Sequence, residues 1–168
     1  MTKIQSILKY AMNMEKDSQT FYEYYADVAE NESTRELFHE LAEIEKDHFR
    51  ILNEKYGDLT AKDPPQVISW VVDDTSREKA PGILADNSDT LGNYGQASLD
   101  LNVIRMAFLI ENDFMNFYEK AAEIVDDPEV RKLLLTFSKW ESGHREMFQE
   151  RYKKLLNEYW KDLSFIFE

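Results

Sequence analysis

The stretch AMNMEKDSQTFYEYYA, residues 11–26, decides the fold, because a matching stretch, AFLIENDFMNFYEKAA, occupies residues 107–122. The shared residues lie 96 positions apart: Ala11, Glu15, Phe21, Tyr22, Glu23 and Ala26 recur as Ala107, Glu111, Phe117, Tyr118, Glu119 and Ala122. A second pair recurs at the same interval, Glu45 and His48 as Glu141 and His144. The chain has 3 histidines, so two of them occupy equivalent places, each three residues after a glutamate. The repeat therefore carries polar chemistry as well as a hydrophobic pattern.

Apolar residues recur every three or four positions along four segments, which predicts four amphipathic helices. Their expected bounds are about residues 3–30, 33–56, 99–125 and 128–157. Ser33 followed by Glu36 predicts the start of the second helix through a capping box, and Gly57 predicts its end. Asp127 before Pro128 predicts the start of the fourth. Because the loops within each pair are short, each pair must be an antiparallel hairpin.

Residues 58–98 separate the two hairpins and contain Pro64-Pro65 and Pro81-Gly82, which exclude one long helix. About 12 extended residues would cover the roughly 37 Å of a 25-residue helix, so this longer segment is expected to carry structure of its own. Val67–Val72 is compatible with a short helix or a strand. The aromatic tail, residues 158–168, is expected to extend or fold back from the fourth helix, with an interface role as the alternative.

These patterns predict an all-α fold, a single domain over residues 1–168. Its architecture would be a four-helix bundle of two antiparallel hairpins joined by a long crossover.

Composition excludes several classes of function. The net charge of −13 argues against nucleic acid and anionic membranes as partners, since both require a basic surface. The absence of cysteine excludes disulfides, zinc–thiolate sites and cysteine nucleophiles within this sequence. No apolar run approaches the length of a membrane span, and no signal peptide is visible, so a cytoplasmic location is expected.

The repeated acidic residues lie where a plain bundle would place apolar ones. Glu15 and Glu111 fall on the apolar stripes of their helices, and both Glu-x-x-His pairs fall on inner faces. Glu15 lies about 22 Å of helix before the first turn, and Glu45 with His48 about 18–22 Å after it, so the hairpin brings them to one level. The second hairpin has the same spacings. Four carboxylates and two imidazoles therefore converge in the middle of the bundle.

Metal binding explains this convergence best. Four buried carboxylates without partners would be very costly, and two divalent cations would neutralise them. Oxygen and imidazole ligands without thiolates suit iron or manganese. A glutamate from each of two helices plus Glu-x-x-His from the other two is typical of di-iron and di-manganese bundles.

The predicted ligands are Glu15, Glu45, His48, Glu111, Glu141 and His144, holding two iron ions, with manganese or zinc as possible occupants. A coincidental Glu-x-x-His on a hydrated seam is the alternative, and its repetition at equal depth argues against it. His39 lies off the stripe and is given no role.

The chain resembles the ferritin-like superfamily, and within it the rubrerythrin-like branch. The family's Ala-x-x-x-Glu followed by an aromatic pair appears at residues 11–22 and again at 107–118, and its paired Glu-x-x-His appears in both hairpins. The resemblance covers the four helices but not the crossover or the tail. It implies two metal positions that share bridging glutamates. One would use Glu15, Glu45 and His48, the other Glu111, Glu141 and His144, with Glu45 and Glu141 as bridges.

The resemblance also implies that Tyr22 and Tyr118 form hydrogen bonds to the ligands; plain core aromatics are the alternative. Two features depart from rubrerythrins proper. The cysteine-free sequence lacks their rubredoxin domain, and Phe114 stands where they carry an extra glutamate. The site is therefore expected to be a symmetric one of six ligands with an external electron donor. Gly143, between two ligands, is expected either to make room for an oxidant or to allow close helix packing.

Three functions fit these expectations. The favoured one is a non-haem di-iron oxidoreductase that reduces peroxide in the rubrerythrin manner, narrowly ahead of dioxygen activation, with an external electron-donor protein. A ferroxidase or iron-handling protein is the second, although the crossover and tail fit a cage shell poorly. A non-catalytic, metal-stabilised bundle is the third. The expected assembly is a homodimer.

Overall fold

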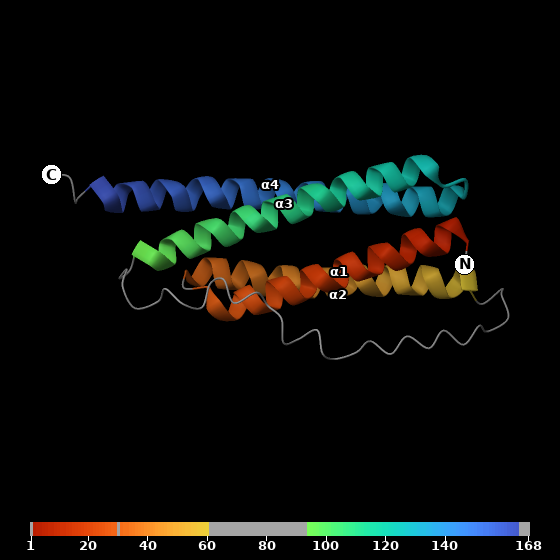
Figure 1. Cartoon of the computed structure of the whole chain (residues 1–168), viewed down its shortest axis with the longest axis horizontal. Coiled ribbons are helices and arrows are strands. Elements are labelled where there is room, and N and C mark those ends of the chain that lie inside the picture. The colour runs from red at the N-terminus through yellow and green to blue at the C-terminus, as the bar shows by residue number, and fades with distance from the viewer. Residues whose placement is uncertain (1, 30, 61–93, 165–168) are drawn as a thin grey trace.

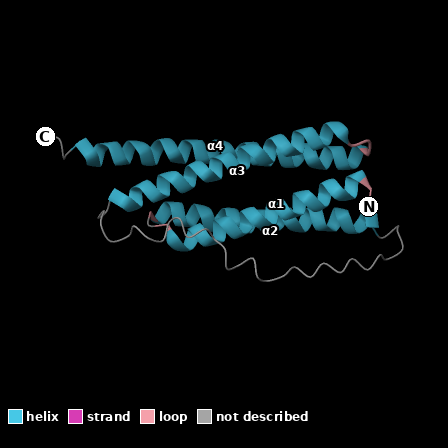
Figure 2. Cartoon of the chain, viewed as in Figure 1, coloured by secondary structure: helices cyan, strands magenta, loops and turns pink. Residues whose placement is uncertain are grey.

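Four long helices make up almost all of the described chain. The structure, a computed structural model, describes residues 2–29, 31–60 and 94–164. The helices are α1 (Lys3–Val28), α2 (Glu32–Thr60), α3 (Tyr94–Ile124) and α4 (Pro128–Ser164). Within these ranges the secondary structure is helix and loop, which confirms the all-α prediction (Figure 2). Most of the expected crossover, with Val67–Val72, and the last four residues of the tail lie outside the described residues.

The helices pair as the sequence predicted. α1 packs along α2, and α3 packs along α4, each as an antiparallel hairpin (Figure 1). The two hairpins meet mainly along α1 and α3, which run in opposite directions. This arrangement places the midpoints of all four helices at one level of the bundle. None of the described helices is long and apolar enough to cross a membrane.

The start of α2 differs from the prediction. Asn31, not Ser33, precedes the first turn: its Oδ1 accepts a hydrogen bond from the Thr34 backbone N–H at 3.2 Å. The Ser33 hydroxyl donates to the same Oδ1 at 2.8 Å, so it supports the cap rather than forming it. Asparagine caps a helix as well as serine does, and either residue was compatible with the sequence.

Gly57 does not end α2, which continues to Thr60. No described glycine has a positive φ, so Gly57 does not adopt the left-handed conformation that a glycine stop requires. The Thr60 hydroxyl instead donates to the backbone carbonyls of Tyr56 and Gly57, at 3.0 and 3.1 Å. The hydroxyl of Thr60 therefore satisfies backbone carbonyls of the last turn of α2, which needs no glycine cap.

The second hairpin also has longer helices than expected. α3 begins at Tyr94 rather than near residue 99, and α4 continues to Ser164, so the described part of the aromatic tail extends α4. The start of α4 agrees with the prediction. Asp127 Oδ1 accepts from the backbone N–H groups of Glu129 and Val130, at 2.9 and 3.0 Å, and Pro128 is the first helical residue.

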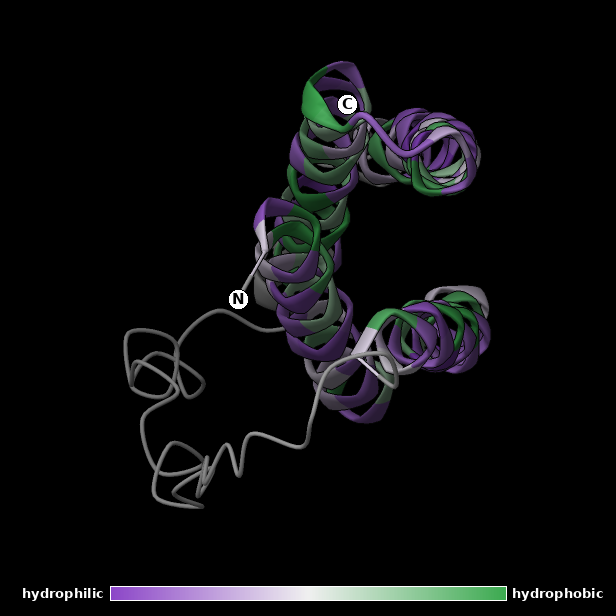
Figure 3. Cartoon of the chain, turned by 90° about the vertical axis from the view of Figure 1, so that its right-hand side faces the viewer, coloured by the Kyte–Doolittle hydropathy of each residue, from purple (hydrophilic) through white to green (hydrophobic). Residues whose placement is uncertain are grey.

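The apolar core is divided into two clusters. One surrounds Tyr22, Phe38 and Phe148, and the other surrounds Tyr118 and Phe137. Seen along the bundle, every helix carries both hydrophobic and hydrophilic segments (Figure 3), as amphipathic helices do. The clusters leave a layer of buried polar side chains at mid-height, and that layer holds the candidate site.

Candidate metal centre

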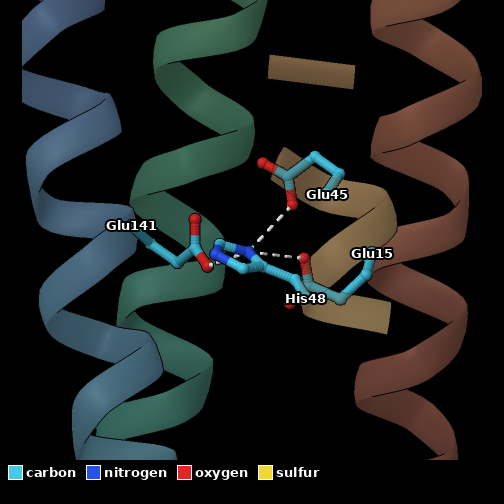
Figure 4. A group of neighbouring side chains, drawn as sticks. All are labelled: Glu15, Glu45, His48 and Glu141. Atoms are coloured by element: carbon cyan, nitrogen blue, oxygen red, sulfur yellow. Dashed lines mark ion pairs between the residues drawn. The ribbon is translucent and has the colours of Figure 1, made fainter. Parts of the chain in front are cut away.

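The structure brings the six predicted ligands together. α1 contributes Glu15, α3 contributes Glu111, and the remaining four come from the Glu-x-x-His pairs of α2 and α4. All four glutamates are 0% exposed. Figure 4 shows Glu15, Glu45, His48 and Glu141 pointing toward one another from three helices, with ion pairs drawn to the His48 ring. These side chains form the polar layer between the two apolar clusters.

The ligand atoms form two overlapping groups. In each group, all the ligand atoms lie within 4.8 Å of one another. The first group is Glu15, Glu45, His48 and Glu141, and the second is Glu45, Glu111, Glu141 and His144. Glu45 and Glu141 belong to both groups, so each has the position of a carboxylate that bridges two ions.

Both histidines direct Nδ1 at three carboxylates at once. His48 Nδ1 lies 3.4 Å from Glu15, 3.2 Å from Glu45 and 3.3 Å from Glu141. His144 Nδ1 lies 3.5, 3.4 and 3.0 Å from carboxylate oxygens of Glu45, Glu111 and Glu141. A ring nitrogen carries at most one hydrogen and cannot bond well to three acceptors. The geometry is that of ligands arranged around a common centre.

Five of the eight glutamate oxygens in this layer, and one histidine nitrogen, lack a hydrogen-bond partner. The unpartnered atoms include His48 Nδ1 and oxygens from all four glutamates: Glu15 Oε2, Glu45 Oε1 and Oε2, Glu111 Oε2 and Glu141 Oε1. Such atoms are rare in folded proteins, because each costs roughly 1–3 kcal/mol and charged ones cost more. Two divalent cations would use them as ligands. The residues present therefore fit a dinuclear metal centre with oxygen and nitrogen donors.

The shifted pKa values of the cluster also indicate that the buried carboxylates are stabilised by positive charge. Burial lowers the pKa of His48 and His144, but the three carboxylates around each ring outweigh it and raise the two values to about 12 and about 9. Burial raises the pKa of Glu111 to about 8 and holds that of Glu45 well above its usual range. For Glu141, the two neighbouring histidines outweigh burial and lower the pKa to about 2. Without metal, protons supply the charge that cations would bring.

This protonation predicts how the stability of the metal-free protein depends on pH. Folding raises the pKa of His144 from 6.5 to about 9 and that of Glu111 from 4.5 to about 8. Each contribution is complete below the unfolded value and is lost as the pH rises through the folded value. The lowered pKa of Glu141 acts only below 4.5, outside this window. We expect the free energy of unfolding to fall as the pH rises from 4.5 to 9, measured by thermal denaturation with a chelator present.

The matched controls are Glu111→Gln and Glu119→Gln. Glu111→Gln removes one of the titrating groups, so its stability should fall less steeply over the same range. Glu119 is an exposed glutamate on the same helix, and its variant should keep the slope of the parent. A metal-free protein whose stability is flat or rising over this range would contradict the protonation described above.

Two buried tyrosines tie the hairpins together through the site. The Tyr22 hydroxyl donates to Glu111 Oε1, and the Tyr118 hydroxyl donates to Glu15 Oε1. Burial and the neighbouring glutamates hold the pKa of both tyrosines well above its usual range, so they remain donors. Each tyrosine reaches the glutamate of the other hairpin, because α1 and α3 are antiparallel and seven residues make two turns. The family resemblance implied hydrogen bonds from these tyrosines to the ligands, but not that each tyrosine reaches the glutamate of the other hairpin.

The structure removes one of the two explanations expected for Gly143 and adds Trp140 to the surroundings of the site. Gly143 is exposed, and an added Cβ would meet no atom within 4 Å, so close helix packing does not explain it. Trp140 was missed in the sequence: its indole stacks on the His48 ring, with centroids 5.1 Å apart and planes 10° apart. The available signal was its position directly before Glu141. Phe114 packs against the cluster around Tyr118.

Fold and site together define a class: four-helix proteins whose buried glutamates and histidines form a site suited to two metal ions. Comparison with known families agrees, since the Rubrerythrin family model matches residues 6–152. The chain belongs to the rubrerythrin family, and its fold is a ferritin-like helical bundle.

A solved structure has a similar fold: a hypothetical protein from Pyrococcus furiosus, Pfu-1136390-001. The two chains superpose with a TM-score of 0.68 at 22% identity, over 93% of this chain and 92% of the other. At this identity the likeness concerns the fold alone. Comparison with curated proteins gives no match.

Proposed function

We propose that this chain is a non-haem di-iron oxidoreductase that reduces peroxide with electrons from an external donor protein. The observation that carries the proposal is the pair of overlapping ligand groups, with Glu45 and Glu141 common to both and unpartnered oxygens buried between them. Iron is favoured over zinc because an open carboxylate–imidazole site without thiolates suits it, although manganese or zinc could occupy the same ligands.

The side chains of the site have separate roles in such a reaction. A bound pair of iron ions supplies two electrons at one place, which matches the reduction of hydrogen peroxide, with two protons, to two water molecules. Glu45 and Glu141, which belong to both ligand groups, would contribute to both metal positions, and Glu15 and Glu111 would each contribute to one. Tyr22 and Tyr118 fix one oxygen of those outer glutamates and leave the other for metal. With six side chains for two ions, the site would leave coordination positions for a small oxidant.

The electron donor in this proposal is a separate protein. The sequence contains no cysteine, so these residues form no thiolate-bound iron centre of the kind that passes electrons one at a time. A homodimer stays a prediction, which size-exclusion chromatography tests. A large shell would favour iron storage instead.

Stopped-flow absorbance tests the choice of oxidant. Anaerobic ferrous protein is mixed in parallel with hydrogen peroxide and with dioxygen, and the oxidation of the iron is followed. We expect the reaction with peroxide to be faster by at least about tenfold, a difference of about 1.4 kcal/mol in activation free energy. Glu15→Gln should abolish the fast phase, whereas Glu119→Gln should keep it. A reaction with dioxygen that matches or exceeds the peroxide rate would overturn the proposal in favour of a ferroxidase.

A further inference from the structure

The two halves of the metal centre are covered differently. On one side, the Trp140 indole stacks on the His48 imidazole, and Phe137 packs against the same ring with centroids 5.0 Å apart and planes at 60°. Trp140 and Phe137 also contact each other at 5.1 Å. Two aromatic rings from α4 thus hold an imidazole from α2, and the His48 side chain is 6% exposed. Trp140 itself is 39% exposed, so it lies between His48 and solvent.

The equivalent positions around His144 lack these rings. The 96-residue repeat pairs Trp140 with Ile44 and Phe137 with Leu41. Among the described side chains, the one ring stacked on His144 is His48, with centroids 5.6 Å apart. The His144 side chain is 13% exposed, about twice the value for His48.

The backbone beside His144 is also uncovered. Gly143, directly before His144, is exposed, and nothing lies within 4 Å of the place its Cβ would take. The two halves of the centre have equivalent ligands, but the aromatic rings of Trp140 and Phe137 contact only the histidine of one half.

This difference bears on how an ion leaves. For an ion to leave a Glu-x-x-His position, water must replace the imidazole, and the ring must turn away from the centre. Trp140 and Phe137 hold the His48 ring on one face and one edge, so turning it requires both contacts to be broken. An aromatic contact of this kind shifts such an equilibrium by about 2- to 12-fold. His144 has no comparable restraint among the described residues and lies closer to solvent.

We propose that Trp140 is a positioning residue that closes the metal position held by His48, so that metal ions exchange with the centre on the His144 side. The inference rests on the dinuclear centre proposed above. It makes the two metal positions unequal although their ligands are equivalent, and it assigns the inequality to one exposed side chain.

Metal exchange tests this directly and does not depend on catalytic activity. The protein is loaded with Co²⁺, which stands in for ferrous iron, and mixed with excess EDTA while the cobalt absorption is followed. We expect two phases of equal amplitude, one ion leaving faster than the other. Trp140→Ile, which copies the residue of the other half, should speed the slow phase about 3- to 10-fold. The converse variant, Ile44→Trp, should slow the fast phase. Trp160→Ile removes a 61% exposed tryptophan of the same helix and should change neither phase.

Tryptophan fluorescence provides an independent readout. Co²⁺ bound beside His48 should quench Trp140, and Trp140→Phe, which keeps a ring in place, should remove most of the quenching. If Trp140→Ile does not fold, Trp140→Phe still tests whether Trp140 lies beside the bound ion.

The outcomes separate the inference from the function on which it rests. Two ions that leave at one rate, or phases that ignore Trp140→Ile and Ile44→Trp, would overturn the inference and leave the dinuclear centre standing. Failure to retain any Co²⁺ would overturn both.

Discussion

Replacing Glu141 by alanine is expected to abolish the binding of both metal ions, so that a chain which binds two ions retains none. Glu141 is common to both ligand groups, and its oxygens lie 3.3 Å from His48 Nδ1 and 3.0 Å from His144 Nδ1. Loss of a partner that merely orients a ligand costs about 10- to 100-fold in metal affinity. Loss of a shared ligand should cost at least as much at both positions. Anaerobic titration with ferrous iron, followed by metal analysis after gel filtration, measures the effect.

The control for this variant is Glu150→Ala. Glu150 is an exposed glutamate on the same helix, more than two turns beyond Glu141, so its variant should bind two ions as the parent does. Circular dichroism checks that both variants remain helical. Retention of two tightly bound ions by Glu141→Ala would contradict the bridging role of Glu141, and retention of one would show that the two positions are held independently.

Metal loading is expected to raise the thermal stability of the protein by a large amount. The four buried glutamates have oxygens without partners, so in the metal-free protein protonation and the two tyrosine hydrogen bonds compensate only part of their desolvation. An ion that binds only the folded chain stabilises it by about 4 kcal/mol when its concentration is 1,000 times the dissociation constant. For a domain of this size, that is a rise in Tm of roughly 8–16 °C for each site.

Differential scanning calorimetry with and without ferrous iron or Co²⁺ measures this rise. Glu141→Ala separates specific from surface binding, because its Tm should not change when metal is added. A Tm that is unchanged in the parent would mean that the buried carboxylates are satisfied without metal, which would contradict the assignment of the site.

The internal repeat made it possible to predict the metal site from the sequence. Equal spacings in the two hairpins placed Glu15, Glu45 and His48 at one depth, and the structure finds them and their counterparts in one layer. Hydrophobic periodicity predicted the four helices, because each stripe must face a partner to be buried, and the short loops predicted the antiparallel pairing. These are long-range regularities, and one exchanged residue does not remove them.

The details that the sequence did not predict depend on local competition or on contacts between the hairpins. Asn31 and Ser33 can both cap a helix, and Gly57 can either end a helix or continue it. Tyr22 pairs with the glutamate of the other hairpin, which follows from the antiparallel contact of α1 and α3. Trp140 breaks the repeat, so a comparison of matching positions passes over it.

Anomalous X-ray diffraction from crystals loaded anaerobically with ferrous iron shows whether the layer of buried glutamates and histidines holds two ions. Data collected on either side of the iron absorption edge locate iron without reference to the surrounding residues. The account predicts two peaks in each chain, about 3.5–4 Å apart as in other two-metal sites. One peak should lie among Glu15, Glu45, His48 and Glu141, and the other among Glu45, Glu111, Glu141 and His144. A single peak, or iron bound elsewhere with this layer empty, would contradict it.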